Sequence, residues 1–263
     1  MKKLCFLTIV VVLLSCWTTA ASIAGGPAGK RPTHIGLKVY HFKTNRQEAL
    51  IDSFLQRQYL PVLHAAGIPA IGVFKPIGND TAADRRVYVL TPFTSLKQWE
   101  SIDNEILAKL PAAGGAYENV AYNNPAYARQ ENMLLKAFDQ MKGLTAPKLA
   151  APKNERVYEL RSYEGASEKV FRNKVQMFNA GGEITLFDRL QFNGIFYGEV
   201  LFGSQMPNLL YMTSFANMPD RDAHWRAFSS DPEWKRLSGR PEYQHNVSHM
   251  TIVFLRPTAY SDL

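Results

Sequence analysis

Apolar and polar positions in the first half of the chain follow the pattern of a mixed α and β domain. Residues 37–42, 70–74 and 86–93 are rich in β-branched, aromatic and alternating apolar positions, which predicts three strands. A helical period predicts one helix over residues 47–60, ended or kinked by Pro61, and a second from Ser95, its expected N-cap, to Leu110. Residues 129–138 fit a strand or a helix, and by analogy with the second half we predict a strand.

The second half follows the same order with clearer signals. Strands are predicted at residues 157–164, 194–202, 208–215 and 247–255. Helices are predicted at residues 167–190, with a break at Gly181-Gly182, and at residues 220–228, and Asp231-Pro232 is expected to start another. Each half is thus β-α-β-β-α-β, the ferredoxin-like plan, which leaves one sheet face open. The predicted fold class is α+β, with two ferredoxin-like repeats whose open faces meet in a pseudo-dimeric α+β barrel.

The opening strands of the halves also share residues. Leu37, Lys38 and Tyr40 have counterparts in Leu160, Arg161 and Tyr163, each 123 positions later, and Trp99 recurs as Trp225 after 126. Gly36 stands where the second half has Glu159, so a site that needs this acid would be asymmetric and would depend mainly on the second half. We therefore predict a degenerate first repeat over residues 34–143, a Pro-containing linker over 144–154 and a second repeat over 155–263.

The first 24 residues have the organisation of a secretory signal peptide. Lys2 and Lys3 precede an apolar run over residues 4–14, which is too short to span a bilayer, and small residues follow. Residues 25–33 are predicted to be a flexible tether. We therefore expect an exported protein, periplasmic or secreted, without a transmembrane span. The alternative is a lipid anchor on Cys16, because residues 13–16 resemble a bacterial lipobox.

Composition narrows the classes of function. Both cysteines, Cys5 and Cys16, lie in the leader, so the folded part can have neither a disulfide nor a cysteine nucleophile. The net charge of +7 comes from Lys and Arg spread among acidic residues, a distribution that favours solubility over nucleic-acid binding. With 46% hydrophobic residues the chain can bury a substantial core.

Several motifs of the second half resemble one known family. They are VYELRSY at 157–163, GGEI at 181–184, NGIFYGEVLFG at 193–203, MPNLLYM at 206–212, HWRAF at 224–228 and DPEWKRL at 231–237. This segment is similar to the NIPSNAP family, and the first half resembles the degenerate partner repeat of two-repeat bacterial members. The resemblance implies the dimeric α+β barrel fold, shared with small monooxygenases, isomerases and haem-degrading enzymes. It implies no defined activity.

Candidate site residues lie on the opening strands. Alternation places Glu159, Arg161 and Tyr163 on one strand face, and we expect this face to point into the barrel together with Lys38 and Tyr40. Such a group could bind an anionic or aromatic ligand or act as acid and base. The competing interpretation is a structural ion pair that joins the two sheets.

Histidines give no metal site by their spacing. His245 and His249 are four residues apart, but the pattern around them is that of a strand, which holds them too far apart for one ion. His249 could line the cavity, and it would be the only axial ligand for a haem-binding role, the weakest of the hypotheses. We predict neither a metal nor a cofactor.

The function favoured by the sequence is a non-catalytic binding module. We expect its barrel interior to take a small ligand or a partner protein, and the chain could also form a homo-oligomer. The alternative is a cofactor-independent monooxygenase or isomerase of the barrel superfamily, which would use the same polar residues.

Overall fold

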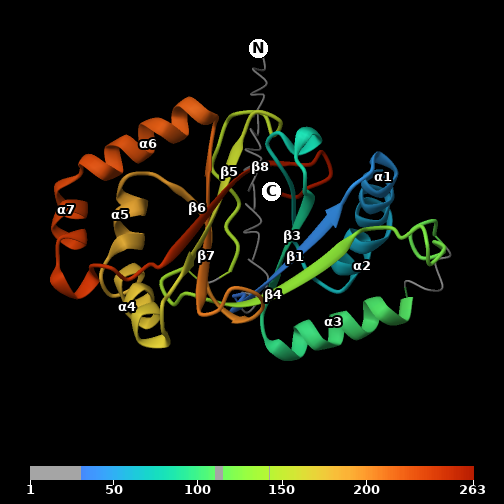
Figure 1. Ribbon diagram of the computed structural model, residues 1–263, viewed down its shortest axis with the longest axis horizontal. Coiled ribbons are helices and arrows are strands. Elements are labelled where there is room, and N and C mark those ends of the chain that lie inside the picture. Colours follow the sequence, from blue (N-terminus) through green and yellow to red (C-terminus); the bar gives the residue numbers. More distant parts are fainter. Residues whose placement is uncertain (1–30, 110–114, 142) are drawn as a thin grey trace, which may run out of the picture. The chain divides into compact units, whose positions relative to one another are not determined.

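Eight antiparallel strands close into a barrel in the computed structural model, which describes residues 31–109, 115–141 and 143–263 (Figure 1). The order around the barrel is β1-β3-β2-β8-β5-β7-β6-β4. The strands are β1 His34–Phe42, β2 Gly72–Pro76, β3 Arg85–Phe93, β4 Arg129–Ala137, β5 Val157–Glu164, β6 Asn193–Phe202, β7 Asn208–Phe215 and β8 His249–Pro257. Each half contributes four neighbouring strands in the ferredoxin-like order, and pairing of β2 with β8 and of β4 with β6 joins the halves. The predicted α+β barrel is confirmed.

The predicted signal peptide, the lipobox cysteine Cys16 and residues 25–30 of the predicted tether lie outside the described residues. In the part of the chain that the structure describes, no helix combines the length and hydrophobicity that crossing a membrane requires.

Helices cover the outer faces of the barrel, with those of the first half on one side and those of the second half on the other (Figure 1). They are α1 Asn45–Phe54, α2 Leu60–Ala65, α3 Leu96–Lys109, α4 Glu168–Phe178, α5 Glu183–Arg189, α6 Met218–Ser230 and α7 Pro232–Ser238. Ser95 and Asp231 cap α3 and α7 as predicted, each accepting a hydrogen bond from a backbone N–H of the first turn. The break after α4 coincides with Gly182, whose φ of 96° lies in the left-handed region.

The first helical segment extends further than its sequence suggested. The helical backbone passes Pro61 and ends at Ala65, because the π-helical segment Leu55–Tyr59 precedes the proline. In this segment the Leu60 N–H donates to the Leu55 carbonyl, one residue further back than in an α-helix. The wider turn accommodates a residue that has no backbone N–H, so Pro61 does not end the helix.

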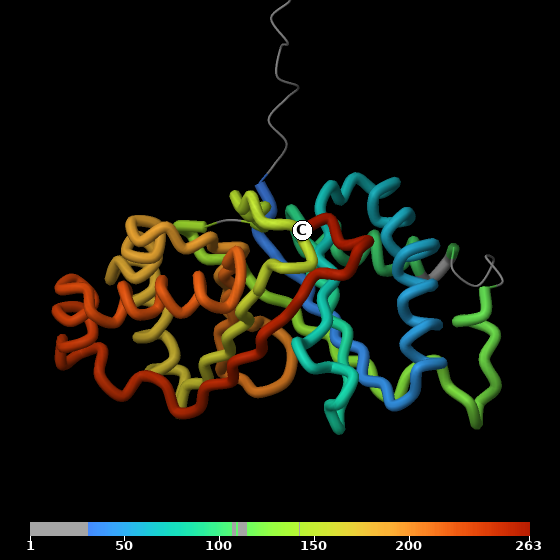
Figure 2. Tube along the Cα trace, turned by 90° about the horizontal axis from the view of Figure 1, so that it is seen from above, coloured from blue at the N-terminus to red at the C-terminus, as the bar shows by residue number. Residues whose placement is uncertain are grey.

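The described residues form three large hydrophobic cores and one small cluster of Met177, Leu237 and Tyr243. The barrel core is built from both halves and includes Leu37, Phe74, Tyr158, Leu160 and Met212. A second core lies between the first-half strands and α1–α3, and a third between the second-half strands and α4–α6. The C-terminal segment runs back to the first half (Figure 2), where the Val73 N–H donates to the Ser261 hydroxyl at 3.0 Å.

Candidate functional site

The side chains of β5 point the opposite way from our prediction. Tyr158 and Leu160 lie in the barrel core, whereas Tyr163 lies in the core under the second-half helices. Because strand residues alternate, Glu159 and Arg161 share the helix-facing side with Tyr163, and their predicted interior placement is wrong. The alternation could not settle the direction, because β5 is buried on both faces and its more apolar side is the one that fills the closed barrel.

Glu159 is the centre of an ionic cluster between β5 and α6. Its side chain is fully buried, and each carboxylate oxygen accepts two hydrogen bonds. Oε1 accepts from Arg161 Nε at 2.7 Å and Arg221 Nη2 at 2.9 Å. Oε2 accepts from Arg221 Nε and Trp225 Nε1, both at 2.8 Å. The Arg161 guanidinium also lies 3.7 Å from the centroid of the Trp225 ring.

The charge balance of this cluster is that of a structural ion pair. Burial alone would raise the pKa of Glu159, but the guanidinium groups of Arg221 and Arg161 outweigh burial and hold that pKa below its usual value. Arg161 Nη1 donates to the Tyr163 hydroxyl at 3.1 Å, which completes the contacts of the predicted trio. Every oxygen of Glu159 is satisfied by protein donors, so the cluster holds α6 on the sheet instead of presenting a group to a ligand.

The two related tryptophans should differ sharply in their contribution to stability. Trp225→Phe removes a donor from a buried carboxylate and should lower the free energy of unfolding by about 1.5–3 kcal/mol. Trp99→Phe is the matched control and should change it by less than about 0.5 kcal/mol, because the Trp99 indole N–H has no protein acceptor among the described residues and its side chain is 40% exposed. Urea denaturation of both variants measures the difference; equal losses would contradict the assignment.

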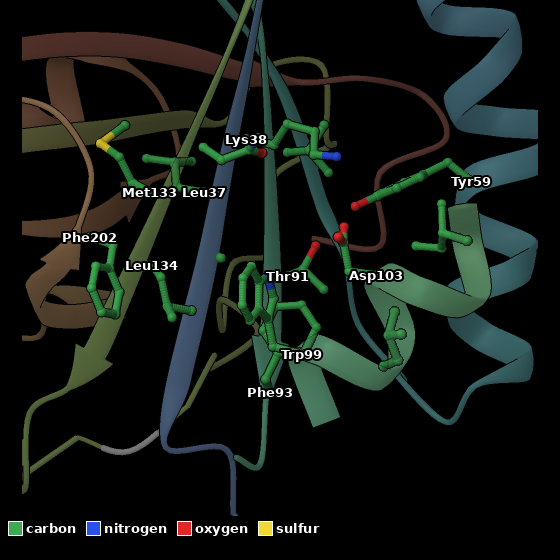
Figure 3. A pocket seen from close by; sticks show the side chains of 15 residues that line it. Leu37, Lys38, Tyr59, Thr91, Phe93, Trp99, Asp103, Met133, Leu134 and Phe202 are labelled. Carbon is green, nitrogen blue, oxygen red and sulfur yellow. The ribbon is translucent and has the colours of Figure 1, made fainter. Parts of the chain in front are cut away.

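The corresponding space in the first half is an open cavity of about 490 Å³, here called the α3 pocket (Figure 3). It lies between the helix-facing side of β1, β3 and β4 and the helix α3. Its polar lining consists of Lys38, Tyr59, Thr91, Asp103 and Asn132. Its apolar lining includes Phe93, Trp99, Ile102, Ile106, Leu134 and Phe202.

Gly36 explains why this half is open. Gly36 pairs with Thr91 in β3, and Glu159 pairs with Thr213 in β7, so the two residues have the same place in the two sheets. Without a carboxylate at Gly36 there is no acceptor to draw Trp99 onto the sheet, as Glu159 does with Trp225. The sequence difference that we expected to restrict a site to the second half instead leaves a cavity in the first.

The polar groups of the α3 pocket gather at one end. Figure 3 shows the Tyr59 hydroxyl and the Asp103 carboxylate directed toward the same region, with Lys38 beside them. Desolvation by burial lowers the pKa of Lys38, partly opposed by the negative charge of Asp103. Burial and Asp103 both raise the pKa of Tyr59, so this phenol stays protonated at neutral pH. The end of the pocket therefore offers an ammonium and a phenol, two donors that suit an acceptor oxygen.

Two other predicted residues lie elsewhere. Tyr40 is buried under the first-half helices, edge-on to Tyr127 at a centroid distance of 5.7 Å. His249 is exposed at the start of β8, opposite Glu164 of β5. It shares a strand face with Thr251, which lines a separate cavity at one mouth of the barrel.

This barrel-mouth cavity is smaller, about 270 Å³, and lies over the packed barrel core. Its floor is apolar and includes Leu37 and Leu160, and its rim carries His41, Arg86 and Glu131. The rim charges are largely paired within the protein: His41 Nδ1 lies 2.8 Å from Asp84, and Arg86 Nε donates to the same carboxylate at 2.7 Å.

Of the α3 pocket, sequence reasoning identified Lys38 alone. It missed Tyr59, Thr91, Asp103 and Asn132, which come from four separate elements and carry no motif. Two features of the sequence indicate this site in retrospect. They are the recurrence of Trp99 as Trp225 and the presence of Gly36 where the second half has Glu159.

Comparison with known proteins gives a family for part of the chain and a fold for most of it. Residues 158–262 match the model of the NIPSNAP family. A provisionally assigned monooxygenase from Lactobacillus acidophilus superposes with a TM-score of 0.55 at 12% identity, over 86% of this chain and 94% of that chain. A second one, from Fusobacterium nucleatum, gives 0.55 at 7% identity, over 86% and 93%.

A NIPSNAP-like domain protein from Burkholderia xenovorans has a TM-score of 0.37 at 20% identity, over 41% of this chain and 90% of that chain. No curated protein matches the sequence significantly. At 12% and 7% identity, the two matches with a TM-score of 0.55 show the barrel fold and leave the activity open. The family match confirms the resemblance found in the sequence: residues 158–262 form a NIPSNAP domain.

Proposed function

We propose that this chain is a small-molecule-binding protein whose ligand occupies the α3 pocket. The observation that carries the proposal is the cavity of about 490 Å³ with a mainly apolar lining and a few polar groups at one end. This is the usual composition of ligand sites, whose volumes are about 300–1,000 Å³. The barrel interior, which the sequence favoured, is filled at its centre by Leu37, Tyr158 and Leu160.

The lining indicates the chemistry of the ligand. Phe93, Ile102 and Ile106 suit a flat or compact apolar body. Lys38 and Tyr59 donate hydrogen bonds and therefore suit an acceptor oxygen such as that of a carboxylate, a phenolate or a carbonyl group. The ligand class is an apolar molecule, aromatic or aliphatic, with one such oxygen at its end.

Binding of 2-naphthoate tests this proposal. By isothermal titration calorimetry we expect one site per chain and an affinity at least about tenfold weaker for Lys38→Met, because a charge-assisted hydrogen bond contributes about 1.5–3 kcal/mol. Lys136→Met is the matched control, because Lys136 lies on the same strand as Asn132 but outside the pocket and is exposed. Absence of binding, or an equal loss in both variants, would contradict the proposal.

A cofactor-independent monooxygenase or isomerase is the second candidate. Its support is the barrel fold shared with the two provisionally assigned monooxygenases and the ammonium and phenol of Lys38 and Tyr59, which could stabilise an oxyanion. Oxygen consumption with 1,4-dihydroxy-2-naphthoate, compared with Lys38→Met, distinguishes catalysis from binding. The polar trio of Glu159, Arg161 and Tyr163 is not part of this candidate, because its groups are paired with one another.

Export is part of the proposal and rests on the basic residues and apolar run of the leader, residues 1–24. The intact mass of the protein recovered from outside the cytoplasm would show cleavage near residue 24, or a lipid on Cys16.

A further inference from the structure

Lys38 differs from the other sheltered lysines in having no acidic partner. Lys174 donates to Glu183 at 2.9 Å, and Lys75 lies 2.7 Å from both Glu48 and Asp52. Among the described residues the Lys38 ammonium makes no hydrogen bond or ion pair, and its Nζ lies 5.1 Å from the centroid of the Tyr59 ring. Sheltered charges are normally paired, so a lysine left unpaired against a cavity needs an explanation beyond stability.

The surroundings of Lys38 favour the neutral amine more than water does. The groups that face it are Tyr59 from the π-helical segment, Asp103 from α3, Thr91 from β3 and Asn132 from β4. The single acid in this set, Asp103, is exposed, and although its negative charge opposes the shift, burial still lowers the pKa of Lys38. A lysine in an apolar pocket is a nucleophile when its amine is unprotonated.

We propose that Lys38 forms an imine with the carbonyl carbon of an apolar aldehyde or ketone bound in the α3 pocket. This inference rests on the proposed function and narrows its ligand class to carbonyl compounds. The Nζ lone pair attacks the carbonyl carbon, a C–N bond forms, and the carbonyl oxygen becomes a hydroxyl. The two hydrogens of the neutral amine then leave with that oxygen as one water molecule, and a C=N bond remains. No oxidant or reductant is consumed.

The pocket supplies the groups that this condensation uses. The Tyr59 phenol remains protonated and can donate to the carbonyl oxygen while negative charge develops there. The Asp103 carboxylate, at the same end of the pocket (Figure 3), can accept a proton from the nitrogen and return it to the departing oxygen. Once an apolar ligand fills the pocket, the walls of Phe93 and Ile106 would shield the imine from hydrolysis by water.

Reductive trapping tests the inference. The full chain is incubated with 2-naphthaldehyde and sodium cyanoborohydride, which reduces an imine to a stable amine, and the site is located by peptide mass spectrometry. We expect a single naphthylmethyl group on Lys38, added at least about tenfold faster than on any other lysine, such as the exposed Lys136. The rate should rise with pH and level off below the ordinary lysine pKa of about 10.4.

Two variants and a competitor make the result decisive. Lys38→Arg keeps the charge but has no amine, so it should lose the fast label while circular dichroism shows an unchanged fold. An excess of 2-naphthoate should slow labelling of the wild-type protein by occupying the same pocket. Labels distributed over lysines according to their exposure, or persisting in Lys38→Arg, would overturn the inference.

The two proposals fail separately. If 2-naphthoate binds but Lys38 is not selectively trapped, imine formation is wrong and the binding function stands. If 2-naphthoate does not bind and no selective label forms, both are wrong.

Discussion

Glu159→Gln should lower the free energy of unfolding by about 3–5 kcal/mol, the usual cost of removing one partner from a buried ion pair. The carboxylate of Glu159 accepts from two arginines and a tryptophan and is fully excluded from solvent. Glutamine preserves the shape, but it leaves the charges of Arg161 and Arg221 without their common counter-ion. Because these contacts join β5 to α6, we expect the loss to appear in urea denaturation as a lower midpoint with little change in slope.

The effect of this substitution should depend on pH in a defined direction. The folded-state pKa of Glu159 is lowered, so its carboxylate stabilises the fold at pH values above the unfolded-state pKa of about 4.3, and this contribution is lost as the pH falls through the folded-state pKa. The difference in stability between wild type and Glu159→Gln should therefore be constant near neutrality and shrink below about pH 4.

Glu233→Gln is the matched control for both measurements. Glu233 pairs with Arg189 at 3.1 Å, but its side chain is 41% exposed, and exposed ion pairs contribute about 0–1 kcal/mol. If Glu159→Gln and Glu233→Gln had equally small effects, the cluster under α6 would not be the structural anchor that its geometry indicates.

The elements of this fold could be predicted from sequence because local rules and tertiary packing agree in most of them. Ser95 and Asp231 cap helices where expected, and the break between α4 and α5 falls at the glycine pair. The segment around Pro61 is different. Proline normally interrupts a helix, but the π-helical turn before Pro61 accommodates it. No single residue in the sequence indicates such a turn.

Which strand face points into the barrel could not be predicted from the sequence. This error placed the predicted site inside the barrel instead of on the helix-facing side. In an ordinary two-layer fold the apolar strand face meets the helices, and that expectation put Glu159 inside the barrel. Closure of the barrel gives the strands a second buried face, and the inner one is packed mainly by apolar side chains of the other strands. The outer face meets helices that can supply arginine and tryptophan as partners, so the charged residues lie there.

Gly36→Glu should close the α3 pocket and weaken binding of 2-naphthoate by at least about tenfold, equivalent to 1.4 kcal/mol. A Cβ at this position would lie 2.9 Å from Cε2 of Phe93, so this ring, which lines the cavity, must shift. The new carboxylate would stand two residues before Lys38, as Glu159 stands two before Arg161, and could pair with its ammonium and accept from the Trp99 indole. Steric filling and loss of the unpaired cation act in the same direction, which is why we expect a large effect.

Two further variants separate these causes from a general effect of an added charge. Gly36→Ala forces the Phe93 shift without a carboxylate, so it should weaken binding less than Gly36→Glu and leave imine trapping at Lys38 measurable. Gln130→Glu places the same carboxylate on the same face of the sheet outside the pocket, and should leave binding unchanged. Retention of full affinity by Gly36→Glu would mean that the missing acid is not what keeps the first half open. Loss of binding together with a blue-shifted Trp99 fluorescence would mean that residue 36 decides what lies between the first-half sheet and α3. With glycine this space is a pocket, and with glutamate it is closed by an ion pair.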